Sequence, residues 1–296
     1  MLRSALVFMS ALYAGHGSAE TLSSGMKWPP PQQRIVSAPN INGAVLFTKS
    51  AENVTIGPVV IEDAFRAIET AQGVTLRNLR VTGLSGRNLQ RDGMRLRHVT
   101  DTIISDFDLQ MRAQPQTGRD LPEGIALYGG SNIVVRDGKV SGFRMAEEND
   151  PKTGKPRYQN GDGISSEKGV NGLLIERVVS SNNSDGGFDL KGRNIRLVDL
   201  TAEDNGKGFR FWEQVAATKL TSVNNKVAVH LIKGATATID MLVASSAGQS
   251  IVILSEGVGT LTIRACDLTK MSAGSVLVKR NDPGAVINLG DGCMLR

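Results

Sequence analysis

Short apolar segments recur along the chain at a nearly constant spacing, and this repeat is the strongest constraint on the fold. From Gly163 onward the segments begin 24, 21, 20, 22 and 25 residues apart, and each is followed by a second segment rich in valine, isoleucine and leucine. A period in the low twenties with almost no helical periodicity predicts an all-β solenoid of parallel strands, a β-helix. A leucine-rich repeat has a similar period, but its fixed leucine and asparagine pattern is missing. The five-residue segments are GMRLR from Gly93, GIALY from Gly124, GISSE from Gly163, GFDLK from Gly187, GFRFW from Gly208, AVHLI from Ala228, SIVIL from Ser250 and SVLVK from Ser275.

The second and fourth positions of these segments predict the core. Successive residues of a strand face opposite sides, so these side chains should stack inward while the first, third and fifth face solvent. Ser166 is the one polar residue among them. The second position holds Met94, Ile125, Ile164, Phe188, Phe209, Val229, Ile251 and Val276, and the fourth holds Leu96, Leu127, Ser166, Leu190, Phe211, Leu231, Ile253 and Val278.

Asparagines recur one coil apart in the turn that follows the second strand. They are Asn182 and Asn183, then Asn205, then Asn224 and Asn225. Amides stacked in this way can bond one another and the backbone of the turn, so we expect an internal asparagine ladder here.

The third position changes in character along the repeat. Charges of both signs gather on the coils between residues 163 and 232 and fade afterwards, and Asp189, Arg210 and His230 should lie on adjacent strands roughly 4.8 Å apart. A cross-strand salt bridge between Asp189 and Arg210 is the structural alternative to a functional site. The series reads Arg95, Ala126, Ser165, Asp189, Arg210, His230, Val252 and Leu277.

The first nineteen residues have the layout of a secretory signal peptide. They carry one basic residue, Arg3, an apolar stretch from Ala5 to Ala14 and a small-residue exit at Ala19. We therefore expect a secreted or periplasmic monomer without membrane insertion, formed by residues 20–296 as a single domain, with 20–60 as the N-terminal cap and first coil. Cys266 and Cys293, the only two cysteines, form one bridge or remain free thiols. The net charge of +5 suits an acidic partner, and nucleic acid is disfavoured by export and by the absence of a basic run with interleaved aromatics.

Three consecutive coils carry a recognisable motif series. The runs NGDGISSE, NNSDGGFDL and GKGFRFW, between about 160 and 212, resemble the calcium-dependent pectate lyases of polysaccharide lyase family nine, which are right-handed parallel β-helices. The resemblance implies a right-handed parallel β-helix with calcium ligands at Asp162, Asp185 and Asp189. It also places Arg210 at the position of the base that removes the C5 proton of a uronic acid.

The chain departs from the family pattern at two positions. Gly186 stands where the family has a second consecutive aspartate, which removes one oxygen ligand from a Ca²⁺ site that needs six to eight; Glu167 and Asn160 are candidates to replace it. Arginine stands where the family has lysine, and a guanidinium is hard to deprotonate. Lys191 and Lys207 are therefore alternative bases.

Further side chains near the charged coils suit a sugar polymer. Trp212 and Tyr128 can stack on sugar rings, and Arg95 can bind an acidic group. His230 either donates a proton to the leaving oxygen or extends the charged ladder. The segments 112–122 and 143–160 interrupt the repeat, as loops that wall a cleft do, and Lys155 and Arg157 within them suit a polyanion. Surface insertions without function are the plain alternative.

These residues predict an exported lyase that cleaves a uronic-acid-containing polysaccharide by β-elimination. Elimination needs a base and a cation, Ca²⁺ or a basic side chain, to neutralise the charge that develops. A uronan C5-epimerase begins with the same proton abstraction and stays an alternative, as does a non-catalytic β-helix that binds an exopolysaccharide. Glycoside hydrolysis needs paired carboxylates, and the double aspartate expected on this fold is broken at Gly186.

Overall fold

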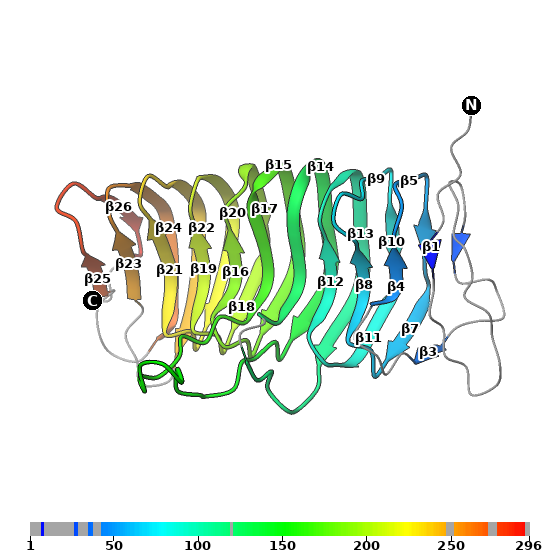
Figure 1. Cartoon of the computed structure of the whole chain (residues 1–296). Coiled ribbons are helices and arrows are strands. Elements are labelled where there is room, and N and C mark those ends of the chain that lie inside the picture. The colour runs from blue at the N-terminus through cyan, green and yellow to red at the C-terminus, as the bar shows by residue number, and fades with distance from the viewer. Residues whose placement is uncertain are drawn as a thin grey trace.

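The chain forms a right-handed parallel β-helix, as the sequence predicts (Figure 1). The computed structural model describes residues 7–8, 27–28, 35–37, 43–118, 121–246, 252–271 and 277–293. Within them every element is a strand, and the coils follow one another from the N-terminal end to the C-terminal end. No helix that could cross a membrane occurs in this described part.

The five-residue segments form one continuous parallel sheet. Its strands run in the order β4 (Gly43–Phe47), β8 (Arg66–Thr70), β12 (Asp92–Leu96), β14 (Glu123–Ser141), β15 (Asp162–Ser181), β16 (Gly186–Leu190), β19 (Lys207–Phe211), β21 (Val227–Ile232), β23 (Val252–Glu256) and β25 (Leu277–Arg280).

The other sides of the coils consist of further strands and of the long continuations of β14 and β15. They are β1 (Val7–Phe8), β2 (Lys27–Trp28), β3 (Ile35–Ser37), β5 (Ala51–Glu52), β6 (Thr55–Ile56), β7 (Val59–Glu62), β9 (Leu76–Arg77), β10 (Arg80–Thr82), β11 (Leu84–Leu89), β13 (Val99–Met111), β17 (Arg193–Val198), β18 (Leu200–Glu203), β20 (Gln214–Val223), β22 (Thr236–Ser246), β24 (Thr260–Met271) and β26 (Val286–Asp291).

The predicted inward stacks form the core. Met94, Ile125, Ile164, Phe188 and Phe209 are in register and fully buried. The rings of Phe188 and Phe209 stack with their centroids 5.2 Å apart. The polar Ser166 is also buried, in register with Leu127 and Leu190.

The predicted register is wrong beyond β21. Val229 pairs with Ile253 and His230 with Leu254, two residues later than the repeat of small residues indicates. The third-position series therefore continues with Leu254 and Lys279 instead of Val252 and Leu277. Ser250 and Ser275, the first residues of the last two predicted segments, lie outside the described ranges. A small first residue therefore did not predict the register of β23.

Corner residues in the left-handed conformation set the bends between strands. Asn53, Asn78, Asp101, Asn132 and Asn194 all have φ between 52° and 57°. Asparagine and aspartate tolerate this conformation better than other residues with a side chain. Several of the side chains bond along the axis, as from Asn78 Nδ2 to Asn53 Oδ1 at 2.6 Å.

The asparagine ladder is confirmed for the second residue of each pair. The Nδ2 group of Asn183 donates to Asn205 Oδ1 at 2.8 Å, and that of Asn205 donates to Asn225 Oδ1 at 3.0 Å. Asn182 and Asn224 take no part in it: both are exposed, with φ of 57° and 51°. The ladder therefore fixes the turn directly before the charged strands β16 and β19.

The two ends of the chain differ in how much the structure describes. Of the expected signal peptide, 1–19, only β1 lies within the described residues, where it pairs antiparallel with β4. Most of the expected cap also lies outside them. Near the C-terminus, Cys266 and Cys293 form a disulfide bond between β24 and the turn after β26. The bond resolves the alternative that the sequence left open and suits an oxidising compartment.

Candidate functional site

The parallel register brings the predicted charged residues together on three coils. Asp189, Arg210 and His230 are direct neighbours across β16, β19 and β21. They are buried, with exposed fractions of 1%, 7% and 3%, so the expectation that third positions face solvent is wrong here. Coils lie so close together that each long side chain covers the next, and a loop residue, Tyr158, also contacts this group.

Arg210 binds two carboxylates at once. Its Nε and Nη2 donate to the two oxygens of Asp189 at 2.9 and 2.6 Å, and its Nη1 lies 2.9 Å from Asp185 Oδ2. Burial disfavours the charged guanidinium, but the bonds and charge of Asp189 and the charge of Asp185 outweigh it and raise the pKa of Arg210. The side chain is thus a fixed cation, and its expected role as a base does not suit this geometry.

Tyr158 is a site residue that the sequence reasoning missed. Its hydroxyl donates to Asp185 Oδ1 at 2.7 Å and accepts from Lys207 Nζ at 2.8 Å and from Arg210 Nη1 at 3.2 Å. The side chain is 59% exposed, and the partial desolvation of its hydroxyl raises the pKa of Tyr158, so the free protein holds the phenol form. The available signal was a tyrosine, one of three in the chain, in the loop that directly precedes the charged coils.

Lys207 completes this group from the start of β19. Its Nζ lies 2.5 Å from Asp185 Oδ1. Burial opposes its charge, yet the bonds to Asp185 and Tyr158 dominate and raise the pKa of Lys207. Lys207 is therefore protonated at neutral pH, which suits a proton donor better than the base expected from the sequence.

Backbone bonds seat the loop that carries Tyr158. The Phe143 N–H donates to Asn183 Oδ1 at 3.0 Å, and the Met145 N–H donates to Ser184 Oγ at 3.1 Å. At the other end of the loop, the Asp185 N–H donates to the Gly161 carbonyl at 2.8 Å. The ladder and the turn that contains Asp185 thus hold both ends of the loop, which fixes the approach of Tyr158.

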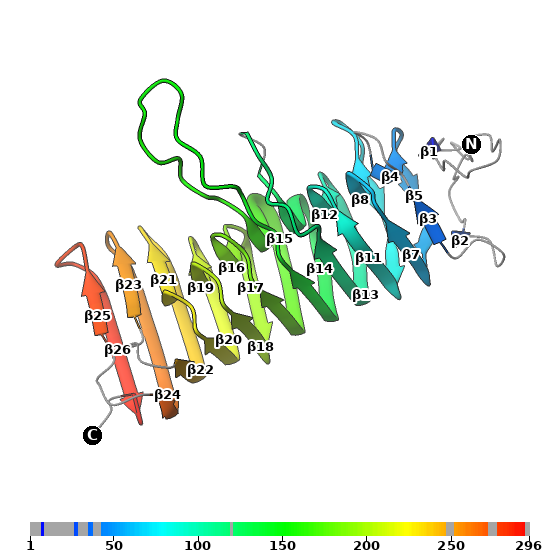
Figure 2. The same ribbon diagram turned by 90° about the horizontal axis from the view of Figure 1, so that it is seen from below.

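The two insertions project from the same side of the β-helix (Figure 2). Arg157 Nη1 donates to the Gly118 carbonyl at 2.8 Å and to Glu148 Oε2 at 2.9 Å, so this expected substrate-binding residue joins the insertions to each other. Lys155 is exposed on the same loop. A cavity of about 830 Å³ lies between the loop and the coils, with Tyr158, Asp185 and Lys207 in its lining.

Asp162 and Gly186 lie side by side at the centre of the group. The Gly186 N–H donates to Asp162 Oδ1 at 2.7 Å. Burial, together with the charges of Asp189 and Asp185, raises the pKa of Asp162 well above its ordinary value.

The acidic residues expected to hold calcium do not fit a calcium site in this arrangement. Arg210 engages both Asp185 and Asp189, and Lys191 engages Glu167 at 2.6 Å. Within the described residues no three histidine, cysteine, aspartate or glutamate side chains are grouped so that they could hold a metal ion. A Ca²⁺ ion needs six to eight oxygen ligands. Here basic side chains pair with Asp185, Asp189 and Glu167, and Asp185 Oδ2 and Asn160 Oδ1 are the buried oxygens of this group without a hydrogen bond among the described residues. The calcium site implied by the family resemblance stays a prediction.

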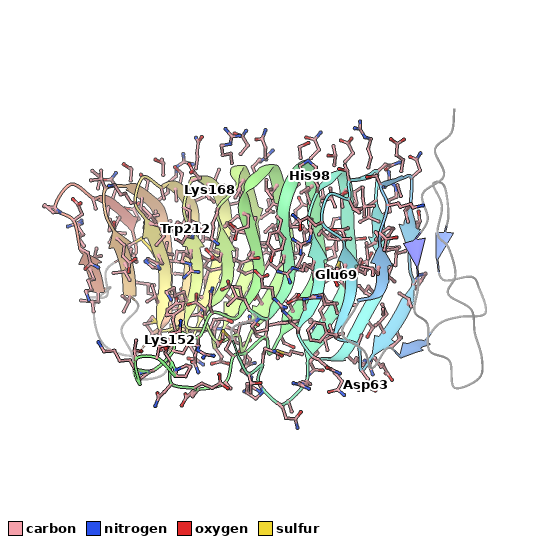
Figure 3. All side chains as sticks on the ribbon, in the orientation of Figure 1. Asp63, Glu69, His98, Lys152, Lys168 and Trp212 are labelled. Carbon is pink, nitrogen blue, oxygen red and sulfur yellow. A yellow bond between two sulfur atoms is a disulfide. The ribbon has the colours of Figure 1, made fainter. Side chains whose placement is uncertain are left out.

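Trp212 and Lys191 form the other border of the site. Trp212 Nε1 donates to Asp189 Oδ1 at 2.6 Å, and Lys191 Nζ lies 5.6 Å from the centroid of the indole ring. Figure 3 shows Trp212 on the same broad face as Glu69, above the loop that carries Lys152. The half-buried indole offers an apolar surface beside Arg210, as the sequence predicts.

His230 is the neighbour of Arg210 on the next strand, β21. The bonds of the Tyr158 hydroxyl go to Asp185, Lys207 and Arg210. Its Nε2 is 3.4 Å from Glu256 Oε2, and neither ring nitrogen makes a hydrogen bond. Burial lowers the pKa of His230, which keeps the imidazole neutral.

Arg95 and Tyr128 occupy a second cluster on the N-terminal side. Arg95 Nη2 donates to the Tyr128 hydroxyl at 2.6 Å. Nearby, the Ser165 hydroxyl donates to Glu123 Oε1 at 2.6 Å, and burial with the charge of Asp92 raises the pKa of Glu123 to about 7. The structure thus separates these two expected substrate-binding residues from the group around Arg210.

Comparison with known proteins gives similarity of fold. No protein-family profile and no curated protein sequence matches the chain. Among solved structures, the chain is similar to an alginate lyase from Paenibacillus sp. str. FPU-7, with 13% identity, a TM-score of 0.46 and coverage of 88% of this chain and 98% of that one. It is also similar to the pectate lyase Pel9A, with 16% identity, a TM-score of 0.43 and coverage of 86% and 71%. The periplasmic alginate epimerase AlgG follows with 12% identity, a TM-score of 0.35 and coverage of 82% and 51%.

Proposed function

We propose that the protein is an exported lyase that cleaves a uronic-acid-containing polysaccharide by β-elimination. One observation carries the proposal: the Tyr158 hydroxyl is held between the Asp185 carboxylate and two cations, Lys207 and Arg210, beside an open cavity. A hydroxyl placed in this way can exchange protons with a substrate, and the cations stabilise the negative charge that forms.

The elimination proceeds by a closed exchange of protons. The Tyr158 oxygen takes the C5 proton of the uronate while its own proton passes to Asp185 across the 2.7 Å bond. The C4–O4 bond breaks as the C4=C5 double bond forms, and the Lys207 ammonium gives a proton to the departing O4. Asp185 then returns its proton to Lys207 across 2.5 Å, which restores the resting state.

Arg210 supplies the positive charge in this scheme. Its Nη1 is 3.2 Å from the Tyr158 oxygen, where negative charge passes during the transfer. The bonds to Asp189 hold the guanidinium in place, so little reorganisation is needed as the charge develops. Trp212, whose indole is anchored on Asp189, offers a stacking surface for the sugar ring.

Ultraviolet absorbance of the unsaturated uronate product tests the proposal. The protein is incubated with polygalacturonate, alginate and glucuronan, with Ca²⁺ and with a chelator. We expect absorbance to rise on at least one polymer, and Tyr158→Phe, which removes only the hydroxyl, to lower the rate by about a hundredfold or more. Lys207→Ala, which removes the proton donor, should also lower the rate. Lys219→Ala, at an exposed lysine on β20, is its control and should leave the rate unchanged.

Other outcomes identify the alternatives. Flat absorbance on every polymer that the protein binds would overturn the lyase proposal. Inverted C5 configuration in the recovered polymer, measured by NMR, would then identify an epimerase. An unchanged polymer would leave a binding protein.

A further inference from the structure

Two arginines flank one tyrosine ring on the open face of the β-helix, N-terminal to the Tyr158 group. The guanidinium carbons of Arg95 and Arg97 lie 5.1 and 5.5 Å from the centroid of the Tyr128 ring. Both arginines and the tyrosine are partly exposed. Two like charges this close to one ring repel each other unless an anion lies between or beside them.

The carboxylates near this pair lie on the side of Arg95: the charges of Asp92 and Glu123 act on Arg95, and the Tyr128 hydroxyl donates to Glu123 Oε2 at 3.3 Å. Arg95 Nη1 is 3.8 Å from Asp92, but the same carboxylate receives Arg66 Nε at 2.6 Å and Arg91 Nε at 3.5 Å. Within the described residues, Arg97 has no ion pair with a carboxylate. The Nε atoms of Arg95 and Arg97 are buried without a hydrogen-bond acceptor. The Tyr128 hydroxyl accepts from Arg95 Nη2 at 2.6 Å, but these two Nε donors have no acceptor among the described residues, and buried donors without acceptors are rare and costly.

The position of the cluster relates it to the proposed active site. Arg97 and Tyr128 directly follow the paired residues Leu96 and Leu127. Lys191 and Trp212 directly follow the paired residues Leu190 and Phe211. Glu167, whose charge is paired with Lys191, lies between the two groups. Tyr128 and Trp212 are three coils apart, roughly 14 Å along the axis, and a pyranose unit is about as long as the spacing of one coil.

We infer that Arg97, Arg95 and Tyr128 form a second carboxylate-binding subsite, which holds a uronate unit of the same polymer a few residues from the unit at Tyr158. The polymer then runs along the axis of the β-helix, with Trp212 and Tyr128 as stacking surfaces near its two ends. The inference rests on the proposed function for the class of ligand, an acidic polysaccharide. It adds that a second acidic sugar is recognised, so the substrate carries uronates at more than one position.

Calorimetric binding of oligouronates of defined length tests this subsite without any turnover. The probes are a saturated disaccharide and a saturated hexasaccharide of the best-bound polymer, together with the carboxyl-reduced hexasaccharide. Tyr158→Phe serves as the background, so that the probes stay intact. The test variant is Arg97→Gln. The control is Arg196→Gln, an exposed arginine on β17.

The expected result is a loss that depends on both length and charge. Arg97→Gln should weaken hexasaccharide binding by about tenfold or more, the effect of one charge-assisted hydrogen bond. It should leave binding of the disaccharide and of the carboxyl-reduced hexasaccharide unchanged, and Arg196→Gln should change nothing. The inference is overturned if Arg97→Gln binds the charged hexasaccharide as tightly as the background does, or loses the same factor on all three probes.

The two proposals fail separately. A protein that shows the length-dependent loss at Arg97 but makes no unsaturated product has the subsite without the lyase activity. A protein that makes the product while Arg97→Gln binds normally is a lyase without this subsite.

Discussion

Gly186 and Asp162 lie so close that the Gly186 N–H bonds Asp162 Oδ1 at 2.7 Å, and a Cβ atom at position 186 would also lie 2.7 Å from that oxygen. A side chain at 186 would therefore have to displace Asp162. The absence of one leaves Asp185 and Asp189 to Arg210. In this arrangement a guanidinium supplies the positive charge beside the two carboxylates.

We predict that the melting temperature of the wild-type protein is the same with Ca²⁺ and with a chelator, because basic side chains already engage the carboxylates. The double variant Gly186→Asp/Arg210→Ala adds an oxygen donor and removes the competing cation, so Ca²⁺ should raise its melting temperature. Gly186→Ala/Arg210→Ala is the matched control and should not respond. A wild-type melting temperature that rises with Ca²⁺ and falls with chelator would contradict this prediction.

Asp189→Asn should destabilise the protein strongly. It leaves Arg210 buried with one of its two carboxylate partners removed, and breaking a buried ion pair typically costs about 3 kcal/mol or more. The free energy of unfolding in urea measures the loss. Asp240→Asn breaks an exposed pair with Arg264, whose side chains are 47% and 66% exposed, and should cost less than about 1 kcal/mol. Equal losses in both variants would show that Asp189 and Arg210 are not a buried pair.

Glu123 should make stability fall as pH rises. Burial and Asp92 raise its pKa from 4.5 to about 7, so the folded protein binds its proton more tightly than the unfolded chain does. The stabilisation is full below the unfolded pKa and is lost as pH rises through about 7. Unfolding in urea at about pH 5 and about pH 8 should show that Glu123→Gln reduces the pH dependence, by up to about 3 kcal/mol. An unaltered slope would exclude a raised pKa at this residue.

Reduction of the Cys266–Cys293 bond should loosen the C-terminal coils. The two cysteines are 27 residues apart, and closing a loop of this size contributes about 3.5 kcal/mol. Coils of a solenoid contact mainly their neighbours, so the Cys266→Ser/Cys293→Ser variant should lose protection from amide hydrogen exchange in β24 and β26 first. Protection lost uniformly along all coils would show that the bond stabilises the whole solenoid instead.

The sequence was sufficient for the fold because the repeat carries its own register. Phe188 above Phe209, and Asp189 beside Arg210, follow from aligned segments whose small first residues mark the start of each strand. The mark fails at Ser250, and there the predicted register is two residues away from the pairing of Val229 with Ile253. Periodicity therefore predicts the cross-strand contacts only where the small first residue of each segment marks the start of its strand.

The sequence was not sufficient for the site in two respects. The burial of Asp189 and Arg210 depends on side chains from neighbouring coils. The alternation of inward and outward residues along one strand does not predict that kind of burial. Tyr158 is 27 residues before Asp185 in the chain, outside the repeat, so no periodicity connects the two residues. A loop becomes part of a site through the bonds at its ends, and those bonds are visible only in the structure.

The loop that carries Tyr158 also separates two tasks within one chain. The coils fix the charges, and a segment outside the repeat brings the hydroxyl to them. Phe143 and Gly161, where that segment leaves and rejoins the coils, bond to Asn183 and Asp185 through backbone groups. A different sequence grafted between residues 143 and 161 could thus keep the same attachment while it changes the reaction or the polymer. The coils are thus the constant part of the protein, and the segment between residues 143 and 161 is the part that can vary.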